Sequence, residues 1–130
     1  MLNQTAIYAV RAMGFMAEQD HEHPVLSSTI AADMNIPRNF LSKIINRLVQ
    51  AGLVLASRGR GGGVKLARPA ADIFLREVVE LFMKVDDYQN CFMGLKTCDG
   101  SCGLHQRWHT ISEQFKKMLD DTTVDQIFKT

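Results

Sequence analysis

Apolar residues recur at intervals of three and four along most of this chain, which is the spacing of helices that bury one face. In the first half of the chain this pattern predicts helices over residues 4–18, 27–34 and 38–51. Ser27 or Ser28 would cap the second helix, and Pro37 suits the start of the third. Gly52 is expected to end the third helix as a left-handed C-terminal cap.

The third helix is predicted to turn one apolar stripe inward and a polar side outward. The expected buried stripe consists of Phe40, Leu41, Ile44, Ile45 and Leu48. Short polar and basic side chains occupy the rest of the helix: Arg38, Asn39, Ser42, Lys43, Asn46 and Arg47. Because a DNA-recognition helix presents such side chains to base edges, these six are the candidates for a groove-facing side.

A glycine-rich basic segment follows this helix. Residues 57–66 predict two short strands joined by a turn that contains arginine and several glycines. A hairpin of this kind can lie along a phosphate backbone, and its candidate contacts are Arg58, Arg60 and Lys65. Two short helices joined by a tight turn and followed by a basic strand pair are the order of a winged helix-turn-helix.

The second half of the chain predicts a helix over residues 73–83, a longer one over 104–119 and a last short turn over 124–128. Apolar residues of the long helix are spaced mainly by four and three, which makes a seam: Leu104, Trp108, Ile111, Phe115, Met118 and Leu119. Such a seam pairs with a second copy of the chain, which we favour, or with the first helix of its own chain.

These elements predict a mainly α-helical protein with a small β-hairpin wing, a winged helix-turn-helix plus a long C-terminal dimerisation helix. We expect a DNA-binding domain over residues 1–83, a cysteine-containing sensor loop over 84–103, and the dimerisation helix with its tail over 104–130. At 130 residues and 46% hydrophobic content, the chain is long and apolar enough for one compact core with a helical extension.

The distribution of charge changes the picture more than its total. Between Met34 and Ala71 there are seven basic residues and no acidic one, although the whole chain carries only +1, so the remainder carries −6. A solvated surface run is the usual meaning of clustered charge. Here the cluster coincides with the helix-turn-helix and hairpin pattern, which favours binding of a polyanion, double-stranded DNA.

Composition also excludes several classes of protein. No apolar stretch is long enough to span a membrane and the start of the chain lacks a secretion-signal pattern, so we expect a cytoplasmic protein without a membrane partner. Neither a phosphate-binding loop ending in Gly-Lys-Ser/Thr nor a histidine–glutamate zinc motif is present, which argues against an enzyme or a cluster carrier. A winged domain that docks only proteins is a second rival, and tight binding to a short duplex would exclude it.

Three cysteines and one histidine fall within fifteen residues, as Cys91-x6-Cys98-x3-Cys102-x2-His105. Three thiols and an imidazole suffice to coordinate a metal ion or an iron–sulfur cluster. The first gap is wide for a zinc knuckle, so iron–sulfur is favoured over zinc. A thiol redox switch and simple burial of the thiols are further alternatives, although the surrounding glycine and polar residues argue against burial.

Several short motifs resemble the Rrf2 family of bacterial transcription regulators, which includes an iron–sulfur assembly regulator and a nitric-oxide-sensing repressor. The motifs are Ala31-Ala32-Asp33-Met34-Asn35-Ile36-Pro37, Phe40-Leu41-x-Lys43-Ile44, Ala51-Gly52-Leu53-Val54, Arg58-Gly59-x-Gly61-Gly62-Gly63 and Leu66-Ala67-Arg68-Pro69, followed by the three cysteines. The resemblance covers nearly the whole chain. The glycine-rich wing together with the cysteine trio is far more specific than a helix-turn-helix alone.

The resemblance implies a homodimer with crossed C-terminal helices and a cluster held close to the DNA-binding unit. By match of position Cys91, Cys98 and Cys102 would be the cluster thiolates, and His105 would be a candidate fourth ligand. Members that sense nitric oxide take a carboxylate from the partner's first helix, but the matching residue here is Ile7, which cannot ligate. The cysteine spacing also differs from that of the assembly regulator, which leaves a two-iron or a four-iron cluster open.

The expected function is a sequence-specific transcriptional repressor that binds a near-palindromic operator as a homodimer. Its affinity for DNA would respond to iron–sulfur status, redox state or nitric oxide. A structural zinc or a thiol redox switch at the same cysteines is the alternative. Ser42 stands where the assembly regulator has a glutamate that helps to select operators, so the operator sequence does not carry over.

Overall fold

The structure is a computed structural model that describes residues 2–20, 22–86, 91–95 and 99–129. In these residues it contains the helices α1 (Gln4–Ala17), α2 (Ser27–Asp33), α3 (Arg38–Gln50), α4 (Leu75–Val79) and α5 (His105–Asp121). A two-stranded antiparallel hairpin is formed by β1 (Val54–Ser57) and β2 (Gly63–Leu66), and 3₁₀ turns lie at η1 (Ala70–Asp72) and η3 (Val124–Gln126). The mainly helical architecture with one hairpin is the fold class that the sequence predicts.

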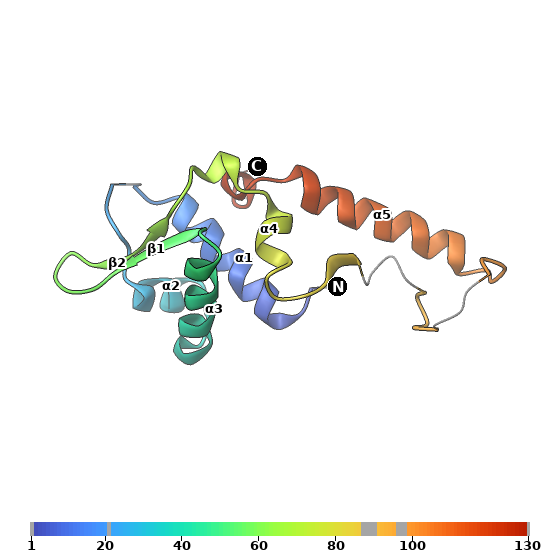
Figure 1. The fold of residues 1–130 in the computed structure, drawn as a ribbon, viewed down its shortest axis with the longest axis horizontal. Coiled ribbons are helices and arrows are strands. Elements are labelled where there is room, and N and C mark those ends of the chain that lie inside the picture. Colours follow the sequence, from blue (N-terminus) through green and yellow to red (C-terminus); the bar gives the residue numbers. More distant parts are fainter. Residues whose placement is uncertain (1, 21, 87–90, 96–98, 130) are drawn as a thin grey trace.

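Figure 1 shows how these elements are arranged. Helices α1 to α4 and the hairpin form one body, and α5 extends away from it along the longest axis of the molecule. The turn between β1 and β2 lies at one end of that axis, whereas the first turn of α5 lies near the other. Among the described residues, no helix has the length and apolar character needed to cross a membrane.

The main core lies between α1 and α3. Ala9, Ala12 and Met13 of α1 are fully buried, and small side chains there let α3 approach closely. Helix α3 contributes four buried side chains to the same cluster: Leu41, Ile44, Ile45 and Leu48. The fifth residue of the predicted stripe is an exception, because Phe40 is 47% exposed.

The ends of the helices confirm one capping prediction and overturn another. Gly52 adopts φ +79°, its N–H donates to the Val49 carbonyl, and the Leu53 N–H donates to the Leu48 carbonyl. This is a Schellman turn, the predicted left-handed end of α3. The prediction of a serine cap on α2 is wrong, since that helix follows Leu26 and has no side-chain cap hydrogen bond.

The hairpin begins earlier than predicted. Val54 pairs with Leu66 and Ser57 pairs with Gly63, so the first strand consists of residues 54–57, Arg58 and Arg60 occupy the turn beyond it, and Lys65 lies on β2. The strand starts at Val54 because that side chain is buried in the core directly after the α3 cap.

The outer edge of β2 is attached to the loop that precedes α2. Val64 donates its N–H to the Val25 carbonyl at 2.8 Å, and Val25 returns a bond to the Val64 carbonyl at 2.9 Å. Gly63 makes this approach possible, because a Cβ on it would lie 2.5 Å from the Val25 carbonyl oxygen. The wing is therefore held by a third extended segment as well as by its own two strands.

The predicted helix over residues 73–83 is much shorter in the structure, where α4 has five residues. Ile73 and Phe74 are extended, and this part of the chain pairs with residues near the C-terminus: Val124 donates to the Ile73 carbonyl, and Leu75, the first residue of α4, donates to the Thr122 carbonyl. These long-range hydrogen bonds replace the helical ones that local apolar spacing favours. They also bring Val124 into the main core, where it is fully buried.

We predict that Gly63→Ala destabilises the protein more than Gly61→Ala. Both glycines have positive φ, but a Cβ at Gly61 meets nothing within 4 Å, whereas one at Gly63 meets the Val25 backbone. The expected losses in the free energy of unfolding are about 1 kcal/mol for Gly61→Ala and about 2 to 3 kcal/mol for Gly63→Ala. Urea unfolding followed by circular dichroism measures both, and equal losses would contradict the proposed attachment of the wing.

Candidate nucleic-acid interface and cysteine segment

The outward side of α3 carries the polar residues that the sequence singled out. All six are exposed: Arg38, Asn39, Ser42, Lys43, Asn46 and Arg47. Their exposure follows from the burial of the apolar stripe, because a helix that buries one stripe must present the opposite stripe to solvent. The buried residues are Leu41, Ile44, Ile45 and Leu48. The structure therefore leaves all six side chains accessible to a ligand along one helix.

Ser42 differs from the other five in its hydrogen bonding. Its hydroxyl donates to the carbonyl of Arg38 at 3.1 Å, one turn earlier in α3. A hydroxyl has a single proton, so in this conformation the Ser42 oxygen can only accept a hydrogen bond from a ligand.

The basic residues of the wing are divided by their partners. Arg58 and Arg60 are exposed in the turn between the strands, and Lys65 is half-buried on β2. Arg68 is bound instead, because its Nη2 lies 2.9 and 3.0 Å from the two carboxylate oxygens of Glu77. Charge counting along the sequence could not make this distinction.

Six of the seven basic residues in the segment thus have no acidic partner within 4 Å in the part of the chain that the structure describes. They are Arg38, Lys43, Arg47, Arg58, Arg60 and Lys65. Uncompensated cations on a helix and an adjoining hairpin create a positive field suited to phosphate groups.

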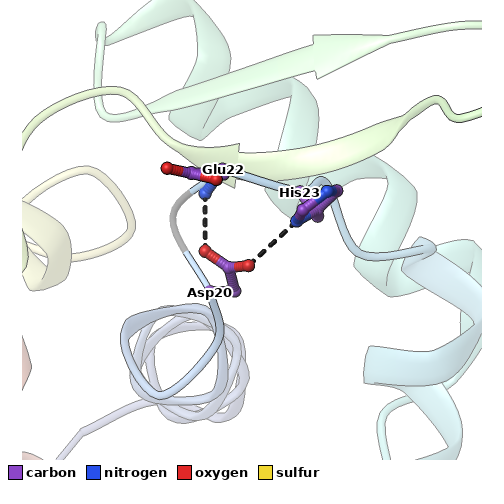
Figure 2. A group of neighbouring side chains, drawn as sticks. All are labelled: Asp20, Glu22 and His23. Carbon is purple, nitrogen blue, oxygen red and sulfur yellow. Dashed lines mark hydrogen bonds and ion pairs between the residues drawn. The ribbon is translucent and has the colours of Figure 1, made fainter.

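The loop between α1 and α2, beside the hairpin, contains a small acidic cluster. Figure 2 shows the Asp20 carboxylate accepting hydrogen bonds from the Glu22 backbone N–H at 3.0 Å and from His23 Nδ1 at 2.9 Å. The potential ligand atoms of these three exposed residues lie within 4.8 Å of one another. These two Asp20 bonds join neighbouring residues, and they shape the turn that leads to Val25, which pairs with Val64 of β2.

We call residues 84–103, the predicted sensor loop, the cysteine segment. Its described residues from Cys91 onward lie at the N-terminal end of α5, away from α3 and the wing of the same chain (Figure 1). Cys91 and Cys102 are half-buried and His105 is exposed, while Cys98 lies outside the described residues. The segment folds back on the first turns of α5. Phe92 packs edge-to-face on Trp108 with ring centroids 5.4 Å apart, and the His105 N–H donates to the Cys102 carbonyl at 3.1 Å.

The turn between the last two cysteines is ordered by its own polar groups. The Asp99 carboxylate accepts bonds from the Ser101 hydroxyl and backbone N–H, which lower the pKa of Asp99. The His105 ring lies against Gly100, where an added Cβ would be 3.6 Å from Nε2.

The donor set suits a soft metal centre, because cysteines and an imidazole occur in one short segment that leads into the first turn of α5. The potential ligand atoms of the described residues are not all close to one another, however. Among the residues that the structure describes, Cys91, Cys102 and His105 are not part of a group whose ligand atoms all lie within 4.8 Å of one another.

Arg76 joins the cysteine segment to the body of the protein. Its guanidinium binds Glu80 at 2.8 Å, Asp86 at 2.9 Å and Asp120 at 2.9 Å. The hydrogen bond to Asp120, followed by that to Glu80, raises the pKa of Arg76, which is therefore always charged. One side chain of α4 thus connects α5 with the start of the cysteine segment.

One side of α5 remains open to solvent. Leu119 is fully buried against its own chain, with Leu75, Val79 and Val85 in the same cluster. Other seam residues are exposed, with values of 43% for Leu104, 51% for Ile111 and 48% for Met118. The alternative that the seam packs wholly within one chain is therefore wrong for these positions.

Comparison with known proteins identifies the relatives of this chain. A family model described as "Rrf2: Iron-dependent Transcriptional regulator" matches residues 2–130. The chain belongs to the Rrf2 family. The HTH-type transcriptional regulator IscR of Xenorhabdus nematophila is 33% identical over 124 residues, which cover 94% of this chain and 75% of that protein. IscR of Vibrio atlanticus is 32% identical, with 94% and 71% covered.

Solved structures of Rrf2 regulators have the same fold. T. potens IscR is similar with a TM-score of 0.76 and 26% identity, covering 99% of this chain and 86% of that one. CymR, described as the global cysteine regulator of B. subtilis, has a TM-score of 0.76 at 22% identity, with 98% and 95% covered. This chain is thus a DNA-binding transcriptional regulator of the Rrf2 type and not an enzyme.

Proposed function

We propose that two copies of this Rrf2 regulator bind a near-palindromic operator, with each α3 in a major groove and each wing along the adjacent backbone. The proposal rests on the six uncompensated cations of α3 and the hairpin. Recognition helices of a two-fold dimer contact half-sites about one helical turn apart, roughly 34 Å. Binding at a promoter would then repress transcription by occupying it.

Within each half-site, Asn39, Ser42 and Lys43 would contact base edges. Lys can donate to guanine and Asn can form paired hydrogen bonds with adenine. Ser42 would serve as an acceptor, because its hydroxyl donates its proton to the backbone carbonyl of Arg38. The arginines of α3 and the wing, with Asn46 and Lys65 beside them, would position the protein on the phosphates.

Dimerisation would occur through α5. Its exposed apolar residues Leu104, Ile111 and Met118 are seven positions apart, and the half-buried Trp108 and Phe115 lie between them. This is the spacing of a two-helix seam, and a 17-residue helix supplies about 25 Å of it. We retain the division into a DNA-binding domain, a sensor loop and a dimerisation helix, within a cytoplasmic protein.

The cysteine segment would hold an iron–sulfur cluster through the thiolates of Cys91, Cys98 and Cys102 and the imidazole of His105. When bound, such a cluster supplies an inorganic centre that responds to redox state and to nitric oxide. The names of the IscR relatives, and a family described as iron-dependent, support this assignment over zinc.

A change in the cysteine segment could reach the DNA-binding face through Arg76. Gathering the ligands would pull on residues 86–91, and Asp86 is bound to Arg76 together with Asp120 of α5. Because the same guanidinium holds α4 against α5, such a pull would alter the angle between the dimerisation helix and the winged body. The spacing of the two recognition helices would follow that angle.

A thiol switch or a structural zinc is the second candidate at the same residues. It is favoured by one observation: the two described cysteines are half-buried rather than fully exposed. The experiments on cluster content described below separate the candidates.

Replacing Arg60 by Ala should weaken binding to all duplexes, because a phosphate contact carries no sequence information. The affinity of the wild type should fall roughly a thousandfold between 50 and 200 mM salt. For each phosphate contact that a variant loses, the slope of log affinity against log salt should become less steep by about 0.9. Arg68→Ala is the matched control, since it removes the same charge from a residue already bound to Glu77. Equal slopes for wild type and Arg60→Ala, measured by fluorescence anisotropy, would remove the wing from the interface.

Anaerobically purified protein is predicted to contain iron and sulfide and to absorb visible light. Cys98→Ala and Cys102→Ala should fold and dimerise without the chromophore, whereas Met93→Ala, an exposed residue in the same segment, should keep it. The only tryptophan, Trp108, packs on Phe92, so reconstitution should also quench its fluorescence.

Zinc content without visible absorption would favour the structural-metal alternative over the cluster. A disulfide found by mass spectrometry, without metal, would favour the thiol switch. Either result would refute the iron–sulfur assignment while leaving DNA binding intact.

Changing Ile111 to Lys should convert a dimer into a monomer of 14.6 kDa, as measured by sedimentation equilibrium. Ile111 is 51% exposed on the seam, and a buried charge there would weaken association by at least about tenfold. Thr110→Lys adds the same charge at an exposed residue that lies about 100° around α5 from Ile111, off the apolar seam, and should leave the dimer unchanged. A dimeric Ile111→Lys protein would place the interface elsewhere.

A further inference from the structure

Phe40 is the one large apolar side chain near the start of α3 that the fold leaves open. It is 47% exposed, whereas Leu41, Ile44 and Leu48 are at most 2% exposed. At 100° per residue, Phe40 lies beside the core stripe on the same flank of the helix as Lys43 and Arg47, three and seven residues further on. An aromatic ring thus lies among side chains assigned to DNA.

The ring is held in place from α1. Tyr8, which packs against the main core, has its ring centroid 6.2 Å from that of Phe40 at an angle of 55°. The Arg11 guanidinium carbon lies 5.6 Å from the Tyr8 centroid, and Arg11 Nη1 donates to the Met34 carbonyl at 3.4 Å. Phe40 is therefore supported on one side by a fixed ring and open on the other.

We infer that Phe40 is a specificity-determining residue that contacts the C5-methyl group of a thymine in each half-site. The inference rests on the proposed docking of α3 in the major groove. A phenyl ring has no hydrogen-bonding group, so it gains nothing from phosphates or from the polar edges of bases. The thymine methyl is the apolar group that the major groove presents. Tyr8 is the positioning residue for this contact, because it limits the directions that the Phe40 ring can take.

The test uses the full-length protein and a duplex selected from a random pool for tight binding. Each thymine is replaced in turn by deoxyuridine, which removes the methyl group and keeps base pairing. Wild type should lose roughly three- to tenfold in affinity at one thymine per half-site, the expected effect of one apolar contact. Phe40→Ala should bind the thymine duplex more weakly by a similar factor and show no further loss with deoxyuridine.

Two other variants guard against a general effect on folding. Phe40→Leu keeps an apolar side chain and should retain part of the thymine preference. Val49→Ala, at a 37% exposed position in the last turn of the same helix, should retain all of it. Circular dichroism and binding to an unrelated duplex check that each variant is folded and still binds phosphates.

The outcomes separate this inference from the proposed function. Phe40→Ala that keeps the full penalty for deoxyuridine would overturn the inference, as would a wild type indifferent to every thymine methyl, although operator binding would stand in both cases. Failure of wild type to bind any selected duplex, metal-loaded or metal-free, would overturn the docking of α3 and this contact with it.

Discussion

The packing of α3 against α1 is the contact on which the other features depend. Alanine side chains at Ala9 and Ala12 let the two helices approach closely, and the apolar stripe of α3 fills the space between them. Once that stripe is buried, the rotation of α3 about its own axis is determined. The outward direction of Asn39, Lys43 and Asn46 follows from the helical period, without any further interaction.

The hairpin extends the same face by a different means. It starts directly after the α3 cap, and its second strand is attached to the loop before α2 through Val25 and Val64. Glu77 pairs with Arg68, and Glu80, Asp86 and Asp120 surround Arg76, so these carboxylates do not neutralise the other cations of α3 and the hairpin. A nearly neutral chain can thereby present six cations on α3 and the hairpin, which is the condition for salt-dependent binding to DNA.

Helix α5 separates the cysteine segment from the DNA-binding elements of the same chain. Its C-terminal end is anchored by Leu119 in the second apolar cluster, while its first turn carries the cysteine segment far from the wing of the same chain (Figure 1). In the function that we propose, a signal at that end would need a rigid connection or a second subunit to reach DNA. The ion pairs of Arg76 would supply the connection, and the exposed seam of α5 would supply the contact with a second subunit.

The local sequence determined the helices of the first half, the cap at Gly52 and the outward residues of α3, because each of these depends on side chains within a few positions of one another. It also indicated the long last helix and the concentration of positive charge. Contacts between distant segments decided the rest. Phe40 lies at the edge of an apolar stripe, and the limited cover that Tyr8 provides leaves it half-exposed. Arg68 differs from Arg60 because Glu77 lies beside it, and Ile73 and Phe74 are extended because the chain returns there at residues 122–124. The local sequence determines which conformation and exposure a residue prefers. Where that preference is weak, the outcome depends on a contact with another segment of the chain, which comes near only after folding.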